Sequence, residues 1–321
     1  MIFAKQIENI YRSKMFNRCD DKGVAFYFSA DDFPGLKSQA YIFASKLGHK
    51  LQGYFYSYSQ PKADRLVVFE HGMGGGHRSY MREIERLAKA GYLVFAYDHT
   101  GCMESGGEST NGFAQSLCDL DDCLQALKKE NSLKGRAISV VGHSWGAFST
   151  MNIAALHPNV THVVAMCGFV SVKDMVAQNF SGILKGYRKG IYALERRTNP
   201  DYVKFNAVES LKKTKAQVLL IYSADDQLVK KEAHYDVLHQ ALSGKENVKF
   251  LLEIGKGHNP NYTADAATYL GEYMTTLAQK LKKLELGNME ERKAFVESFD
   301  WWRMTEQDDA VWNVILETLA K

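Results

Sequence analysis

The hydrophobic residues of this chain gather in short, almost continuous runs, and amphipathic stretches separate one run from the next. The runs lie at 65–70, 92–98, 137–142, 162–167, 217–222 and 248–254. Strands of this kind are typical of a parallel sheet with helices on both faces. Stretches with helical character include 80–90, 112–130 and 145–156. We therefore predict an α/β fold with a doubly wound, mostly parallel sheet and right-handed crossovers.

The region before the first of these runs has a different pattern. Residues 41–45 and 51–58 indicate two strands joined around Gly48, and the alternation in the second predicts an antiparallel edge of the sheet. Residues 1–14 have helical spacing. Their apolar face would consist of Ile2, Phe3, Ile7, Ile10 and Tyr11. We assign 1–36 to a helical and extended segment that packs on the core.

A long stretch between the strands that end near Val170 and begin at Gln217 mixes aromatic with basic side chains. A structureless loop of that length is uncommon in a compact domain. We therefore predict a small helical cap at 171–212, and the alternative is a surface excursion without a role in binding.

The end of the chain carries further helical spacing, and we assign 287–321 to a C-terminal helical extension. Its Trp301 and Trp302 are expected to serve packing. The core then consists of 37–170 and 213–286.

The composition is that of an ordinary globular protein, with 45% hydrophobic and 24% charged residues among 321. The net charge of +3 lacks the basic excess of a nucleic-acid-binding protein. The five cysteines have no metal-ligand spacing and are expected to be free thiols in a reducing compartment. Charges interrupt the N-terminus, and no apolar run approaches the ~18 residues that span a bilayer. We expect a cytoplasmic protein without nucleic acid, metal, cofactor or stable membrane insertion.

The strongest chemical signal is Gly-His-Ser-Trp-Gly at 142–146, between a predicted strand and a predicted helix. The serine of such a motif sits on a sharp turn, where side chains at the two glycines would collide with neighbouring backbone. The turn exposes the hydroxyl at the N-terminus of the helix, whose dipole favours developing negative charge. Ser144 is thus the candidate nucleophile, and the alternative is an ordinary serine that caps the helix.

A serine hydroxyl is a poor nucleophile without a base. The candidate is His258 in Gly-Lys-Gly-His-Asn-Pro at 255–260, directly after the last predicted strand. A glycine-rich loop at this place can aim an imidazole back at Ser144. The alternative is a loop histidine that faces solvent.

The acid that orients this histidine should follow the strand that ends at Tyr222. Asp225 and Asp226 are adjacent there, and only one of them can point at the imidazole. We choose Asp226 for its spacing to the following valine, with Asp225 as the fallback and Asp174 as a more distant third. Either of the adjacent residues could instead cap a helix.

Acyl transfer also needs N–H donors for the oxyanion. A glycine-rich stretch at 70–77 follows the strand at 65–70. The backbone N–H groups of Met73 and Trp145 are the candidate donors. A phosphate loop is a weaker interpretation, because no Gly-Lys-Ser or Gly-Lys-Thr follows the glycines.

Four motifs together resemble the successive signatures of α/β-hydrolases. They are His-Gly-Met-Gly-Gly at 71–75, Asp-His-Thr-Gly-Cys-Met-Glu-Ser-Gly-Gly at 98–107, Gly-His-Ser-Trp-Gly at 142–146 and Gly-His-Asn-Pro at 257–260. The chain is most similar to the group of monoacylglycerol lipases, lysophospholipases and serine aminopeptidase-like hydrolases, over about 37–286. It departs from that group at Thr100–Met103 and at Ala147, and these departures leave the substrate open.

The resemblance implies the α/β-hydrolase fold, with Ser144, Asp226 and His258 as the triad and Met73 and Trp145 as the oxyanion hole. The expected function is hydrolysis of a small-molecule carboxylic ester, either a short or medium acyl ester or a monoacyl lipid, through an acyl-enzyme. The alternatives are a peptidase or amidase of the serine aminopeptidase type and a non-catalytic ligand-binding protein. No oligomeric state follows from the sequence.

Overall fold

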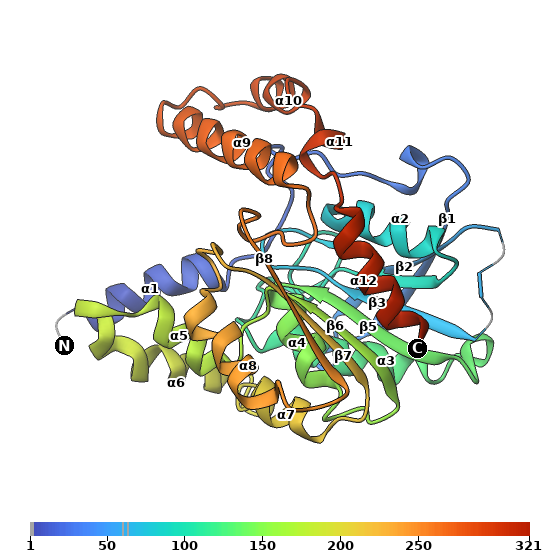
Figure 1. The fold of residues 1–321 in the computed structure, drawn as a ribbon. Helices are drawn as coiled ribbons and strands as arrows, with labels where there is room; N and C mark the ends of the chain where they lie inside the picture. The colour runs from blue at the N-terminus through green and yellow to red at the C-terminus, as the bar shows by residue number, and fades with distance from the viewer. Residues whose placement is uncertain (1–2, 60, 63) are drawn as a thin grey trace.

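A single sheet of eight strands forms the centre of the molecule (Figure 1). The computed structural model describes residues 3–59, 61–62 and 64–321, so Ile2 of the predicted N-terminal apolar face lies outside the described residues. The strand order is β1-β2-β4-β3-β5-β6-β7-β8, and β2 runs antiparallel to both of its neighbours while the strands from β4 to β8 are parallel. The strands are β1 Lys37–Ala44, β2 Lys50–Ser57, β3 Arg65–Glu70, β4 Leu93–Tyr97, β5 Ala137–His143, β6 Val160–Met166, β7 Gln217–Ser223 and β8 Val248–Glu253. The predicted doubly wound, mostly parallel sheet is confirmed.

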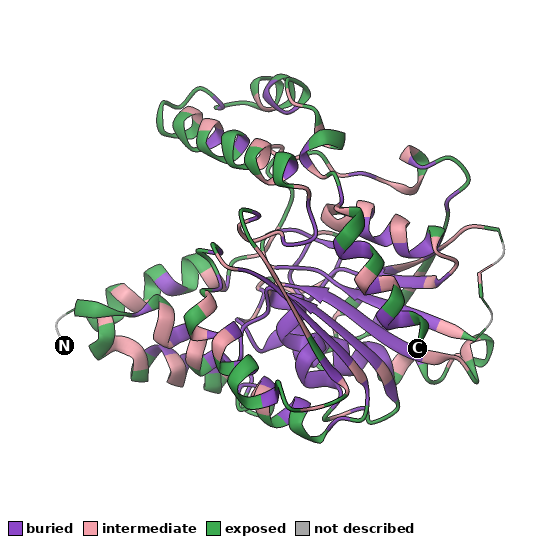
Figure 2. Cartoon of the chain, viewed as in Figure 1, coloured by how far each residue is buried: buried purple, intermediate pink, exposed green. Residues whose placement is uncertain are grey.

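Successive side chains of a strand point to opposite faces of the sheet. The nearly continuous apolar runs of the inner strands therefore make both faces of the sheet apolar. In β3, Leu66 and Val68 belong to one buried cluster, and Val67 and Phe69 belong to another. The first cluster also takes in α3 Gln115–Leu127, α4 Trp145–Ile153, α7 Ala207–Lys213 and α8 Tyr235–Leu242. The second takes in α2 Met81–Lys89 and α12 Asp309–Ala320. Figure 2 shows the central strands, β3 to β7, buried along most of their length.

Helix α12 returns to the sheet, although the sequence analysis assigned the whole of 287–321 to an extension. It contacts β6 and β7, and Trp312 is 0% exposed. The indole Nε1–H of Trp312 donates to Gln307 Oε1 at 2.7 Å. Helical spacing identifies a face that must be buried, but it does not say which surface that face covers.

The helices between the loop of His258 and α12 form a separate lobe. This C-terminal lobe, residues 264–304, contains α9 Ala264–Lys282, α10 Met289–Glu297 and α11 Trp301–Met304. It has a small core of its own, made of Tyr273, Leu277, Leu286, Phe295 and Met304. The lobe stands away from the sheet in Figure 1. In chain order it is inserted between the loop of His258 and α12.

A helical cap covers the edge of the sheet on the side away from the C-terminal lobe. It consists of α5 Val172–Asn179, a 3₁₀ helix at Gly182–Tyr187 and α6 Arg188–Thr198. Helix α1 Ala4–Met15 packs against α6, and the Tyr11 hydroxyl donates to Glu195 Oε1 at 2.6 Å. Helix α7, which the sequence analysis included in the cap, instead packs on α4.

No helix among the described residues combines the length and the apolar character that crossing a bilayer requires.

The packing of α12 predicts unequal roles for two tryptophans near the C-terminus. Trp312→Ala should lower the free energy of unfolding by ~3–5 kcal/mol, because it empties a filled site on the sheet. Trp302 is 47% exposed, and Trp302→Ala should cost less than ~2 kcal/mol. Urea denaturation of both variants measures the two effects, and equal losses would contradict the placement of α12 in the core.

Candidate active site

Ser144 lies at the junction of β5 and α4, where its backbone is strained. Its φ of 56° falls in the left-handed region, which is uncommon for a residue with a side chain. A Cβ atom at Gly142 would lie 2.4 Å from Thr150 Oγ1, and one at Gly146 would lie 2.3 Å from the carbonyl oxygen of Glu70. The sharp turn therefore requires glycine at both positions, as the motif predicts.

Trp145, which follows Ser144 and begins α4, lines the same cavity as Ser144. The N–H of Ser144 itself donates to the Met166 carbonyl at 2.8 Å, and its carbonyl accepts the Phe148 N–H at 3.1 Å. Trp145 is the first residue of α4, so its N–H has no acceptor within the helix. The partial positive charge of the helix N-terminus adds to the field at this point.

The loop after β3 passes close to Ser144. A Cβ atom at Gly72 would lie 3.4 Å from the Cβ of Ser144. The next residue, Met73, lines one cavity together with Ser144 and Trp145. The structure thus brings both predicted oxyanion donors and the candidate nucleophile to the same cavity.

His258 and Asp226 form a hydrogen-bonded imidazole–carboxylate pair. The distance from His258 Nδ1 to Asp226 Oδ2 is 2.7 Å. An ionised carboxylate can only accept, so Nδ1 carries the proton and Nε2 keeps its lone pair. Burial alone would raise the pKa of Asp226, but the hydrogen bonds from His258 and from the N–H groups of Val229 and Leu228 outweigh it and hold that pKa below its usual value.

The two alternative acids have other partners. Asp225 accepts the N–H of Gly255 at 2.9 Å and the N–H of Gly257 at 3.1 Å, so it binds the backbone of the loop that carries His258. Asp174 accepts the hydroxyl of Ser171 at 2.5 Å in the first turn of α5. Of the three acids considered, Asp226 is the one that contacts the imidazole.

A chain of hydrogen bonds joins the loop after β3, which carries Met73, to the loop that carries His258. The N–H of Gly72 donates to the Tyr80 oxygen at 3.1 Å, and the Tyr80 oxygen lies 2.9 Å from His143 Nδ1. His143 Nε2 lies 2.6 Å from the His258 carbonyl. A carbonyl only accepts, so His143 carries its proton on Nε2 and accepts the Tyr80 hydroxyl at Nδ1. Burial lowers the pKa of His143 to about 3, which keeps this ring neutral.

Sequence reasoning missed Tyr80 and His143 as positioning residues. His143 stands inside the Gly-x-Ser-x-Gly motif, but the motif places no requirement on that position. Tyr80 lies just before α2, and nothing in its neighbourhood along the chain indicates a partner after β5.

Ser144 and His258 line a cavity of about 470 Å³ between the core and the cap. Apolar residues dominate its wall, with Met15 from α1, Met175 from α5, and Phe113, Phe169, Leu228 and Val229. Among the described residues, the His258 ring is hydrogen-bonded to Asp226 but not to the Ser144 hydroxyl. Hydrogen bonds between a nucleophile and its base often tighten only when substrate binds.

One group of side chains near the site has donor atoms close enough to suggest a metal. Atoms of Cys167, Asp226 and His258 lie within 4.8 Å of one another. His258 Nδ1 already donates to Asp226, and burial raises the pKa of the Cys167 thiol well above its ordinary value. A metal needs deprotonated donors, so this group does not fit one.

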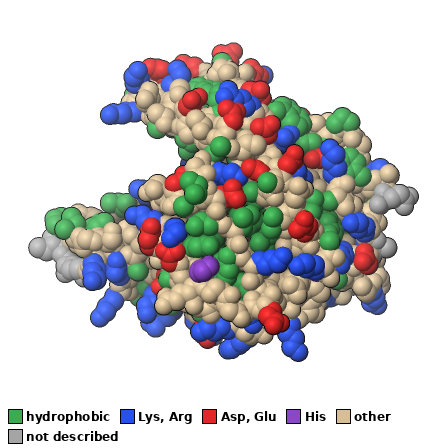
Figure 3. Space-filling model, in the orientation of Figure 1, with side chains coloured by type: hydrophobic (Ala, Val, Ile, Leu, Met, Phe, Trp, Pro, Cys, Tyr) green, Lys and Arg blue, Asp and Glu red, His purple; other side chains and the backbone are tan. Residues whose placement is uncertain are grey.

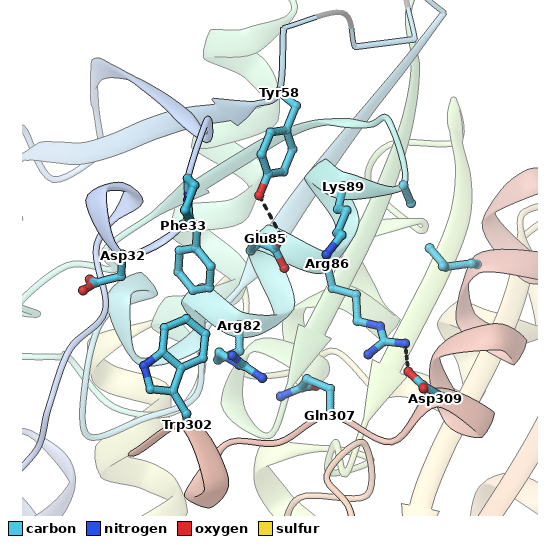
Figure 4. Close-up of a pocket in the computed structure, with 13 residues that line it drawn as sticks. Asp32, Phe33, Tyr58, Arg82, Glu85, Arg86, Lys89, Trp302, Gln307 and Asp309 are labelled. Atoms are coloured by element: carbon cyan, nitrogen blue, oxygen red, sulfur yellow. Dashed lines mark hydrogen bonds and ion pairs between the residues drawn. The ribbon is translucent and has the colours of Figure 1, made fainter. Parts of the chain in front are cut away.

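A larger cavity of about 820 Å³ lies elsewhere, between α2 and the segment around α12 (Figure 4). Two pairs of its polar side chains contact one another. The Tyr58 hydroxyl donates to Glu85 at 2.8 Å, Arg86 pairs with Asp309, and Arg82 stacks 4.4 Å from the centre of the Trp302 ring. It contains none of the candidate catalytic residues.

Comparison with known proteins agrees with this architecture. A family model described as serine aminopeptidase, S33, matches residues 61–200. The esterase Pf2001 of Pyrococcus furiosus superposes with a TM-score of 0.59 at 21% identity, over 84% of this chain and 98% of that one. The α/β-hydrolase GrgF of a Penicillium species superposes with a TM-score of 0.54 at 17% identity, over 78% and 98%.

This chain has the α/β-hydrolase fold. Its sequence relatives include the uncharacterized protein YqkD of Bacillus subtilis, which is 22% identical over 74% of this chain and 79% of the relative. They also include a monoglyceride lipase homolog of Monkeypox virus, 30% identical over 37% of this chain and 42% of the relative. The predicted resemblance to α/β-hydrolases is confirmed.

The hydrogen-bond chain through Tyr80 predicts that this residue affects turnover at the candidate active site. Tyr80→Phe removes the hydroxyl that joins Gly72 to His143, and one such bond is worth about 1 kcal/mol, so kcat on p-nitrophenyl butyrate should fall roughly five- to tenfold. Tyr54→Phe is the control, since the Tyr54 hydroxyl donates to Glu104 instead. An unchanged kcat in the Tyr80 variant would show that the connection does not position the site.

Proposed function

We propose that this protein is a hydrolase that cleaves carboxylic esters through an acyl-enzyme on Ser144, with His258 as the base and Asp226 orienting it. The observation that carries the proposal is the 2.7 Å hydrogen bond from His258 Nδ1 to Asp226, beside a cavity that Ser144 also lines. Esterase and lipase-like relatives support the same class of reaction.

The proposed reaction has two steps. Nε2 of His258 takes the Ser144 proton as the hydroxyl attacks the ester carbonyl, and the N–H groups of Met73 and Trp145 bind the oxyanion. His258 then gives its proton to the departing alcohol. Water attacks the acyl-enzyme with His258 again as base, and the acid is released.

The wall of the 470 Å³ cavity favours an apolar acyl group. Phe113 and Phe169, whose ring centres are 5.2 Å apart, line it together with Met175 from helix α5 of the cap. Burying hydrocarbon against such a wall contributes about 25 cal/mol for each Å² removed from water. An acyl chain of short to medium length fits a cavity of this volume.

The peptidase alternative requires a carboxylate to hold the α-amino group of its substrate. No aspartate or glutamate lines the cavity among the described residues, and its charged side chain is Lys14. The cavity therefore favours an ester over a peptide with a free N-terminus, although the matching family model carries the aminopeptidase description.

Replacement of the nucleophile tests the proposal. Ser144→Ala should lower kcat on p-nitrophenyl butyrate by ~10³-fold or more, because neither the base nor the oxyanion donors can supply a covalent step. A fluorophosphonate probe should label the unchanged chain and not the variant. Equal turnover by the two proteins would refute the nucleophile, and a chain that neither turns over esters nor reacts with the probe would be a binding protein.

A further inference from the structure

A second cavity, of about 360 Å³, meets the first at the candidate active site. The two share Gly72–Gly74, Tyr80, His143 and His258, and then extend in different directions. The first runs beneath the cap. The second runs toward the C-terminal lobe, which Figure 3 shows separated by a deep recess from the part of the molecule that carries α1.

The wall of the second cavity is mostly apolar and comes from segments far apart in the chain, with Ser79, Asn259 and Thr305 among its polar residues. Its main apolar residues are Phe26, Phe28, Leu270, Met274, Trp301 and Met304. Phe26 meets Phe28 edge to face with ring centres 4.9 Å apart, and its ring centre lies 6.3 Å from that of Trp301, so residues 25–28 and α11 form a continuous aromatic surface. No lysine, arginine, aspartate or glutamate lines the cavity among the described residues.

The positions of the reacting groups assign a part of the substrate to each cavity. The acyl group becomes bonded to Ser144, and the cavity beneath the cap is the one that contains Ser144 and Trp145. The departing alcohol receives its proton from His258. Both cavities contain His258, but the second contains neither Ser144 nor Trp145, so we assign it to the alcohol that leaves rather than to the acyl group that stays on Ser144.

We propose that the C-terminal lobe and residues 25–28 form the binding site for the alcohol part of the ester, and that this alcohol is apolar. The inference rests on the proposed esterase function. It makes the substrate an ester with hydrocarbon on both sides of the reacting carbonyl. A polar alcohol such as glycerol would place hydroxyl groups against the apolar residues that make up most of the wall, where the loss of hydrogen bonds to water is unfavourable.

The test varies the alcohol and the acid separately. Acetates of methanol, butanol and hexanol are compared with methyl esters of acetic, butyric and hexanoic acid, with acid release as the measurement. In the unchanged protein, kcat/KM should rise at least tenfold from methyl acetate to hexyl acetate.

Met274→Glu places a charge on the wall of the second cavity at a residue that is 54% exposed, so folding should tolerate it. The ratio of kcat/KM for hexyl acetate to that for methyl acetate should fall about tenfold. Leu281→Glu is the matched control, about two turns farther along α9 and 45% exposed, and its ratio should stay that of the unchanged protein.

Two results would overturn the assignment while leaving the esterase proposal intact. In the first, the unchanged protein hydrolyses the methyl esters, but its kcat/KM for hexyl acetate is about the same as for methyl acetate. In the second, the Met274 variant keeps the hexyl-to-methyl acetate ratio of the unchanged protein. If no ester of either series is hydrolysed, the proposed function itself fails, and the assignment of the alcohol site fails with it.

Discussion

The turn after β7 carries two adjacent carboxylates, and the position of His258 depends on both. Asp226 accepts a hydrogen bond from the imidazole, and Asp225 accepts hydrogen bonds from two backbone N–H groups of the glycine-rich loop from which that imidazole projects. A loop containing Gly255 and Gly257, both with positive φ, has little preference for one conformation of its own. The hydrogen bonds to the two carboxylates therefore fix the conformation of the loop. The carbonyl of His258 adds a third contact, to His143, so the loop is held from β5 as well as from β7.

The core of the fold could be predicted because parallel strands that are buried on both faces must be apolar at nearly every position. The sharp turn at Ser144 could be predicted from the spacing of Gly142 and Gly146, because neither position has room for a Cβ atom. Asp226 was preferred from its spacing, but sequence alone did not exclude Asp225, since adjacent residues share the same turn.

The parts that sequence reasoning missed depend on contacts between distant segments. The Tyr80–His143 hydrogen bond joins the start of α2 to the end of β5. Helix α12 and the lobe before it have similar helical spacing, yet one covers the sheet and the other encloses a small core of its own. Amphipathic patterns show that a face is buried, and only the tertiary arrangement decides against what.

The C-terminal lobe is inserted between the loop of His258 and α12, and in our account it contributes to the choice of substrate. The likeness to the Pyrococcus furiosus esterase covers nearly all of that chain and 84% of this one, so part of this chain has no counterpart there. Segments added beside a conserved reaction centre can change the substrate without changing the chemistry. In our account the cap faces the acyl group and the C-terminal lobe faces the alcohol.

The most direct measurement of the central claim compares kcat for Asp226→Asn and Asp225→Asn on the same ester. An amide at 226 can no longer hold the imidazole in the tautomer with a free Nε2, and kcat should fall by ~10³-fold or more. An amide at 225 loses part of the contact to the loop backbone, and the loss should be about tenfold. A smaller loss at 226 than at 225 would contradict the account, because the imidazole would then take its orientation from a different acid.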